Sequence, residues 1–226
     1  SKLSFVVATS FMIFSCSNDQ ALKNRANELA QKFIITDGHI DTPWKLSKNY
    51  EDISMRTKTG DFDYVRAKEG GLNVPFMAIY IPSSYIETGG AKEKADSLID
   101  MVEQIANKNP DKFEIAYNLA DANRIFQEGK VALPMGMENG VGIEDDLSNL
   151  KYFYDRGIRY ITLTHSQDNL ICDSSYDESE DRWGGLSPYG RKVVKEMNRL
   201  GIMVDISHVT DDVSYTHLKL PTNREE

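Results

Sequence analysis

The residues of the early chain that could do chemistry stand two positions apart. Asp37, His39 and Asp41 follow the β-prone residues 33–35. Residues two apart on a strand point to the same face, so a strand here would project the three side chains in one direction. An imidazole nitrogen beside a carboxylate oxygen can bind a divalent cation such as zinc. Taken alone, the triplet also fits an ordinary strand end, which Pro43 would close by withdrawing a backbone donor.

Three further residues that can bind a metal or a proton follow β-rich runs of the sequence. They are Glu138 after residues 131–137, His165 after residues 159–163, and His208 after residues 202–206. Helical stretches separate these runs, and such alternation predicts a parallel sheet of the α/β class. Polar residues that emerge at the carboxyl ends of parallel strands favour a barrel with its site in that mouth.

The remaining elements can be placed by periodicity and by turn residues. A strand is expected over 72–81, and helices are expected over 19–32, 91–108, 118–128, 146–156 and 188–200. Two polar segments, 45–68 and 166–186, are expected to be irregular, and loops of the second length are usually functional or mobile. Asp205 has the opposite parity to His208 and is expected to face the surrounding helices.

Composition bounds the class of protein. The chain has 226 residues and a formal net charge of −9, and 40% of its residues are hydrophobic, which is typical of a globular protein. The acidic balance, with no basic stripe, argues against a nucleic-acid partner. The two cysteines, Cys16 and Cys172, imply no disulfide framework.

Residues 1–16 have the pattern of an export signal. Lys2 precedes an apolar run, ending at Phe14, that is too short to span a bilayer as a helix. Ser15 and Cys16 resemble the lipobox of bacterial lipoproteins, in which cleavage leaves a lipidated cysteine. The alternative is a plain secretory signal whose cysteine is incidental. Both interpretations predict export to the bacterial periplasm or the outer-membrane surface, and the first adds a lipid anchor in the membrane.

Six ordered groups of residues carry a family resemblance. They are DGHIDTPW at 37–44, GGLNVPF at 70–76, GMENG at 136–140, YITLTH at 160–165, GLSPYGR at 185–191 with NRLG at 198–201, and VDISH at 204–208. Together they cover about residues 33–211, and chance matches to all six in order are not credible. The chain resembles the membrane dipeptidase (renal dipeptidase) family of zinc peptidases.

The resemblance implies a (β/α)8 barrel of the TIM type, of the metal-dependent hydrolase kind, with two zinc ions bridged by a glutamate. Carried over by position, His39 and Asp41 would bind the first zinc, Glu138 would bridge the two, and His208 would bind the second. His165 would contact the substrate and stabilise the charged intermediate. Such a site hydrolyses the peptide bond of small dipeptides through a metal-activated water.

Simpler roles remain open for several of these residues. Glu138 could be a solvated loop acid, His165 could cap a strand end, and His208 could cap a helix. Asp37 has no ligand role in the family and is interpreted as a hydrogen-bond acceptor behind the ligands. Cys172 is expected to be an ordinary thiol rather than a zinc ligand.

The resemblance ends after about the fifth strand of the barrel. A typical barrel needs ~250 residues, whereas about 210 follow the predicted signal segment. The sequence therefore predicts an incomplete barrel over 17–212. The tail over 213–226 shows no helical or strand period and does not continue the family pattern, as a foreign segment would. With a zinc histidine and a substrate arginine of the family unmatched, this chain alone is expected to be inactive.

Two other functions are weighed against a zinc dipeptidase. One is a non-catalytic lipoprotein that uses the same barrel to bind a small peptide. The other is a related amidohydrolase-type enzyme acting on a non-peptide amide. A homodimer is left open.

Overall fold

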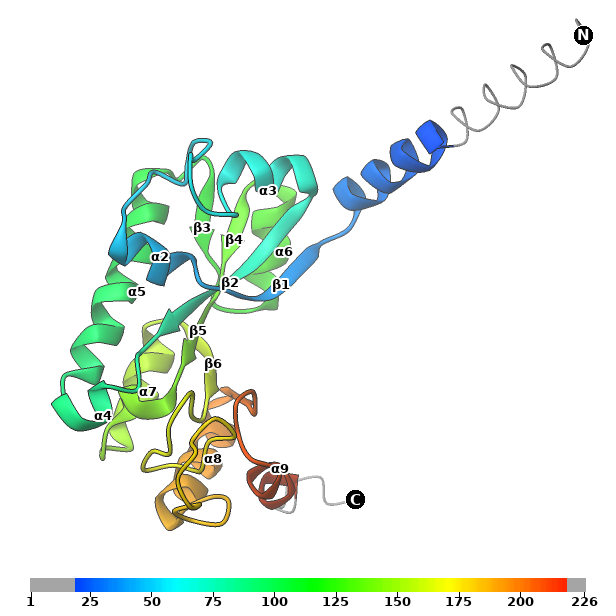
Figure 1. Ribbon diagram of the computed structural model, residues 1–226. Helices are drawn as coiled ribbons and strands as arrows, with labels where there is room; N and C mark the ends of the chain where they lie inside the picture. Colours follow the sequence, from blue (N-terminus) through cyan, green and yellow to red (C-terminus); the bar gives the residue numbers. More distant parts are fainter. Residues whose placement is uncertain (1–18, 219–226) are drawn as a thin grey trace, which may run out of the picture.

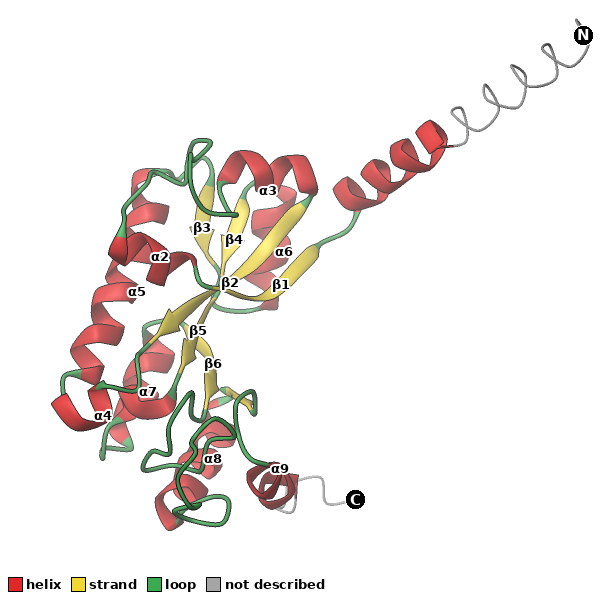
Figure 2. Ribbon diagram, in the orientation of Figure 1, coloured by secondary structure: helices red, strands yellow, loops and turns green. Residues whose placement is uncertain are grey.

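Five parallel strands form the sheet from which the functional residues emerge (Figures 1 and 2). The structure, a computed structural model, describes residues 19–218, with side chains through residue 215, so Cys16 lies outside the described residues. In spatial order the strands are β1 (Ile35–Ile40), β2 (Leu72–Tyr80), β5 (Met135–Glu138), β6 (Ile158–Thr162) and β7 (Met203–Asp205). The sheet curls, as expected for part of a barrel.

Three amphipathic helices cover one face of this sheet. They are α5 (Ala91–Lys108), α7 (Ser148–Asp155) and α8 (Pro188–Leu200), close to the predicted bounds. Their buried apolar side chains, such as Leu98, Phe153 and Val194, join one core with Met137 and Ile161 of the strands. Removing this apolar surface from water is the main force that holds each helix on the sheet.

The caps of α8 follow the sequence signals. The Ser187 hydroxyl accepts a hydrogen bond from the Gly190 N–H at 2.8 Å, and Pro188 occupies the first turn. Gly201 ends the helix at φ 81°, in the left-handed region that favours glycine. The predicted start and end of this helix are confirmed.

The expected strand over 131–137 is in fact two strands. Pro134 separates β4 (Val131–Leu133) from β5, because proline has no N–H to donate to a sheet. β4 pairs with β3 (Phe113–Ile115) in a small second sheet, next to α6 (Leu119–Gln127). Only three residues long, β3 is too short to show a period, so it is not predictable from the sequence pattern.

Several short helices were also missed. The segment 45–68 was expected to be irregular, yet α2 (Thr42–Lys48) and α3 (Tyr64–Gly70) occupy its two ends. The loop after β2 holds α4 (Tyr85–Thr88), and a 3-10 turn, η1 (Gly140–Ile143), follows β5. α9 (Asp211–Leu218) enters the range 213–226, so the absence of regular structure expected there is wrong up to residue 218. Val213 is fully buried and anchors α9 to the core.

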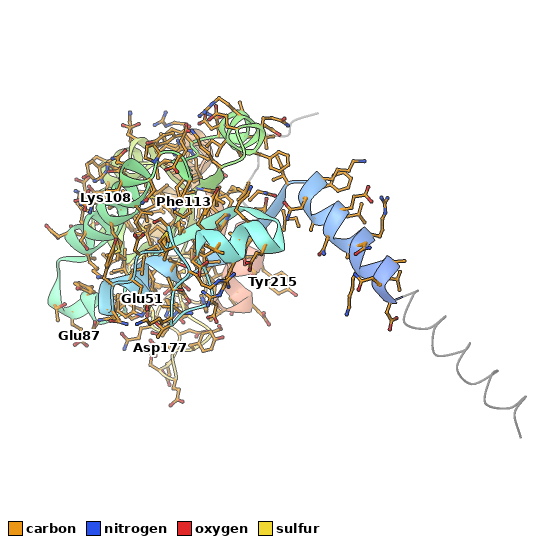
Figure 3. The ribbon with its side chains drawn as sticks, turned by 90° about the horizontal axis from the view of Figure 1, so that it is seen from above. Glu51, Glu87, Lys108, Phe113, Asp177 and Tyr215 are labelled. Carbon is orange, nitrogen blue, oxygen red and sulfur yellow. The ribbon has the colours of Figure 1, made fainter. Side chains whose placement is uncertain are left out.

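The predicted helix over residues 19–32 is present, and it extends away from the body of the molecule (Figures 1 and 3). In the view of Figure 3, Phe113 lies within that body, whereas the helix projects from its edge, where Nε2 of Gln31 donates to the carbonyl of Lys68 at 2.9 Å. Within residues 19–218, no helix combines the length and the apolar character needed to cross a bilayer.

Candidate metal centre

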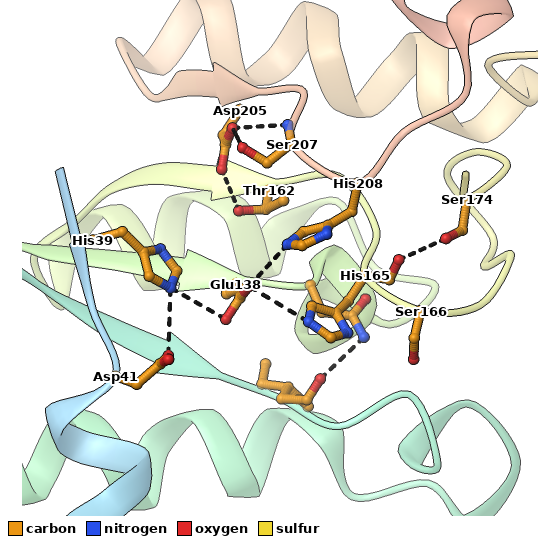
Figure 4. A network of polar contacts seen from close by, with 12 residues as sticks. His39, Asp41, Glu138, Thr162, His165, Ser166, Ser174, Asp205, Ser207 and His208 are labelled. Carbon is orange, nitrogen blue, oxygen red and sulfur yellow. Dashed lines mark hydrogen bonds and ion pairs between the residues drawn. The ribbon is translucent and has the colours of Figure 1, made fainter. Parts of the chain in front are cut away.

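Glu138, the last residue of β5, lies at the centre of a polar cluster (Figure 4). Its side chain is only 8% exposed. Oε2 of Glu138 lies 3.4 Å from Nε2 of His39, whereas Oε1 lies 3.2 Å from Nε2 of His208 and 3.6 Å from Nε2 of His165. The two carboxylate oxygens therefore face two different sets of nitrogen donors.

These donors form two groups that share Glu138. His39, Asp41 and Glu138 bring their ligand atoms within 4.8 Å of one another, and Glu138, His165 and His208 do the same. Within the first group, Nε2 of His39 also lies 3.4 Å from Oδ1 of Asp41. All five residues predicted for the centre are thus brought together. Asp37 belongs to neither group, but its Oδ1 accepts the N–H of His39 at 3.0 Å.

The first group is built where β1 turns into α2. His39 is the fifth residue of β1, and Asp41 stands at the N-cap of α2, so the expectation of one strand carrying Asp37, His39 and Asp41 is wrong for Asp41. Pro43 explains the early helix start, because its fixed φ suits a first helical turn. A cavity of about 550 Å³ opens beside this junction, and it reaches Asp41 and Trp44.

The second group is held by the long loop over 166–186. Ser174 donates its hydroxyl to the carbonyl of His165 at 2.6 Å, and the N–H and hydroxyl of Ser175 both bond the carbonyl of His208. His208 has φ 69°, a conformation that is uncommon outside glycine and that needs support from its surroundings. The loop supplies that support at both histidines, whose ring centroids lie 4.5 Å apart.

Charge and burial act against each other at this cluster. Burial alone would raise the pKa of Glu138, but the hydrogen bond with His39 and the charges of the three histidines lower it overall. The hydrogen bond to Glu138 raises the pKa of His39 despite partial burial. Burial lowers the pKa of His165, which favours its neutral form.

Asp205 does not face the helices as expected. The parallel register pairs Glu138 with Thr162 and Thr162 with Asp205, which sets the three side chains on one face of the sheet. Asp205 accepts hydrogen bonds from the hydroxyls of Thr162 and Ser207. These bonds outweigh the effect of burial and lower the pKa of Asp205. Strand alternation does not relate Asp205 to His208, because β7 ends at Asp205 and His208 lies beyond it.

Three residues that hydrogen-bond the predicted site residues were not predicted from the sequence. They are Tyr160, Ser174 and Ser175. Tyr160 opens one of the family-like segments, so a signal for it existed, whereas the serines lie in a segment without periodicity. Cys172 is fully buried and belongs to neither metal-capable group among the described residues.

The donor set fits zinc. Imidazole nitrogens and carboxylate oxygens are its usual partners besides thiolate. In the described part of the chain, Glu138 and Asp41 pair only with histidines and with no lysine or arginine. A buried carboxylate without a permanent cation is a place where a bound dication would supply the missing charge.

Proteins similar to this chain include dipeptidases. An uncharacterized dipeptidase of Schizosaccharomyces pombe is 32% identical over 211 residues, which is 87% of this chain and 51% of that protein. The structure of the probable dipeptidase PvdM from Pseudomonas aeruginosa is similar with a TM-score of 0.78 at 26% identity, over 88% of this chain and 52% of that one. The chain thus spans about half the length of such relatives, and its curled sheet is part of a TIM-like barrel.

A second solved structure carries a ligand. It is a metallo peptidase from Rhodobacter sphaeroides liganded with a phosphinate mimic of the dipeptide L-Ala-D-Ala, at a TM-score of 0.73 and 25% identity, over 84% of this chain and 63% of that one. Residues 23–221 match the family described as membrane dipeptidase, peptidase family M19, and this match overlaps the range 213–226. The chain belongs to the membrane dipeptidase family of metallopeptidases.

Proposed function

We propose that the full-length protein is a binuclear zinc dipeptidase. The observation that carries the proposal is the position of Glu138, whose two oxygens face separate donor groups at 3.2 to 3.6 Å. A carboxylate is suited to this task because it has two oxygens and a negative charge that offsets paired dications. His39 and Asp41 would hold the first zinc, and His208 would hold the second.

The protein groups around the ions have separate tasks in this proposal. Bound zinc would supply an activated water and polarise the peptide carbonyl. Glu138, with its lowered pKa, stays ionised near neutral pH and contacts the histidines of both donor groups. His165, whose pKa is lowered by burial, would donate a hydrogen bond to the oxygen that gains charge in the transition state.

Small dipeptides are the proposed substrates, including those with a D-residue at the C-terminal position. The dipeptide mimic held by the Rhodobacter sphaeroides structure supports this choice. The cavity beside Asp41 and Trp44 offers space next to the first donor group.

Metal analysis combined with an activity assay tests the proposal. The full-length protein should hold two zinc ions per chain and hydrolyse L-Ala-D-Ala, lose activity to a chelator, and regain it with zinc. Peptide binding without zinc or hydrolysis would favour a non-catalytic binding protein. Hydrolysis confined to non-peptide amides would favour an amidohydrolase-type enzyme.

We further propose that residues 1–226 alone do not support this activity. The relatives are about twice as long as this chain. Of the zinc ligands predicted for the second donor group, this chain supplies only His208 and the shared Glu138. The 226-residue chain is expected to bind zinc incompletely and to hydrolyse dipeptides poorly. A cooperative thermal transition with stoichiometric zinc and full activity would contradict this.

Localisation is proposed from the sequence. Cys16 would carry the lipid that anchors an exported protein to a bacterial membrane. Cys16→Ala should move the protein from the membrane fraction to the soluble fraction after export. Unchanged membrane attachment would contradict the anchor.

A further inference from the structure

The second ring nitrogen of His39 has a partner that the dipeptidase proposal does not use. Nδ1 of His39 lies 2.8 Å from the hydroxyl of Tyr160, which stands on β6 three strands away from β1. The same imidazole turns its Nε2 toward Asp41 and Glu138 (Figure 4). One ring therefore joins the metal-facing carboxylates to a tyrosine inside the curled sheet.

The tautomer of His39 decides whether Nε2 can bind a cation. A neutral imidazole carries its proton on one nitrogen only, and the other nitrogen keeps the lone pair that binds metal. If Nδ1 donates its proton to the oxygen of Tyr160, Nε2 presents its lone pair to the space between Asp41 and Glu138. The opposite tautomer would point a proton into that space and block coordination.

The ring of Tyr160 occupies a space that exists because residue 136 is a glycine. Tyr160 is 7% exposed, and its ring lies against Phe76 with centroids 5.6 Å apart. A Cβ atom at Gly136 would lie 2.1 Å from the Tyr160 ring, so any other residue at that position would displace the ring. Burial, together with nearby carboxylates such as Asp205, raises the pKa of Tyr160, so the phenol stays neutral. The structure thus gives Tyr160 a fixed place.

We propose that Tyr160 is a positioning residue that fixes the tautomer and the orientation of His39 for metal binding, and that Gly136 is a glycine because the tyrosine ring needs its space. This inference rests on the proposed metal centre. Partners behind a ligating histidine typically contribute about 10–100-fold to metal affinity.

Tyr160→Phe tests the inference, because it removes one hydroxyl and keeps the ring in its space. Stepwise Zn²⁺ affinities of the full-length protein are measured by competition with a chromogenic chelator, and Co²⁺ absorption spectra report the ligand geometry. We expect one of the two binding steps to weaken by about tenfold or more, with an altered Co²⁺ spectrum and an unchanged second step. Gly136→Ala should weaken the same step by displacing the ring.

Tyr154→Phe is the matched control, since the Tyr154 hydroxyl makes no hydrogen bond within the described residues and α7 lies on the other face of the sheet. It should leave both steps unchanged. Equal zinc affinities in Tyr160→Phe and the unaltered protein would overturn the inference, and so would an equal weakening of both steps.

Nitrogen NMR of the zinc-loaded full-length protein gives a second readout. With Nε2 held by zinc, long-range ¹H–¹⁵N spectra should show the Nδ1 proton of His39 shifted downfield and slow to exchange, because it is hydrogen-bonded to the oxygen of Tyr160, and Tyr160→Phe should remove both effects. An Nδ1 proton with the same shift and exchange rate in Tyr160→Phe would overturn the inference. Failure of the unaltered protein to bind zinc would instead contradict the proposed function, so the two failures can be told apart.

Discussion

Nε2 of His208 lies 3.2 Å from Oε1 of Glu138, although 70 positions separate the two residues in the chain. Their strands are not neighbours, because β6 lies between β5 and β7. The contact forms because His208 follows the end of β7 in a left-handed conformation, held by Ser175 of the long loop. The centre therefore depends on a loop conformation as well as on the sheet.

Replacing the shared carboxylate should weaken both metal sites together. Glu138→Gln keeps the shape of the side chain but removes its charge and one metal-binding oxygen. Loss of a residue behind a metal ligand typically weakens metal binding by about 10–100-fold. Because Glu138 is proposed to bind both ions directly, we expect a larger fall in zinc affinity at both steps, measured by chelator competition. Glu87→Gln, at an exposed acid on α4, should change neither step. Loss of one step only would argue against a bridging role.

His165 can be assigned to the substrate or to the metal by one variant. His165→Ala should lower kcat for a dipeptide by about 10²–10³-fold, because a donor to the transition state is lost. The protein should still hold two zinc ions by metal analysis. Retained activity, or loss of one zinc ion, would show that His165 does not have the proposed role.

The loop that holds the histidines can be tested by its stability. Ser174 is 2% exposed, and Ser174→Ala would leave the partly buried carbonyl of His165 without this donor. The free energy of unfolding should fall by about 1–3 kcal/mol, the usual range for an unsatisfied buried group, as measured by urea unfolding. Ser97→Ala is the control, since the exposed Ser97 hydroxyl also bonds a backbone carbonyl but water can replace it. Equal effects of the two variants would contradict the role of Ser174.

Long periodic elements and strand-end residues could be predicted from the sequence. The helix over 91–108 has a continuous apolar stripe, and its bounds agree with α5. Glu138 could be placed because it follows a buried strand, and strand ends meet at one edge of a parallel sheet.

The features that could not be predicted from the sequence depend on contacts between residues far apart in the chain. Ser174 and Ser175 donate hydrogen bonds to backbone carbonyls 9 and 33 positions away. The local sequence pattern around the two serines does not indicate these partners. The turn of Asp205 toward Thr162 follows from sheet register, which one strand does not reveal. Short elements such as β3 are fixed by pairing rather than by propensity.

The buried carboxylate of Asp63 predicts how acid destabilises the segment before α3. Asp63 caps α3 by accepting the N–H of Arg66 at 2.8 Å, binds Thr57, and pairs with the guanidinium of Arg66. Burial would raise its pKa, but these hydrogen bonds and the Arg66 charge lower it overall. A lowered pKa stabilises the folded state above the unfolded value of about 3.9. That contribution is lost as pH falls through the folded value.

Asp63→Asn should therefore lower the free energy of unfolding at pH 7 by about 1.5–3 kcal/mol, the range for hydrogen bonds to a charged group. The difference from the unaltered protein should hold above about pH 4 and shrink as pH is lowered further, through the folded pKa of Asp63, because protonation of Asp63 removes the same interactions. Urea unfolding at a series of pH values measures both. Asp61→Asn should have little effect at any pH, because the side chain of Asp61 is exposed and its pairing with Lys45 is screened by water. Parallel pH curves for Asp63→Asn and the unaltered protein would show that Asp63 is not the group that acid titrates here.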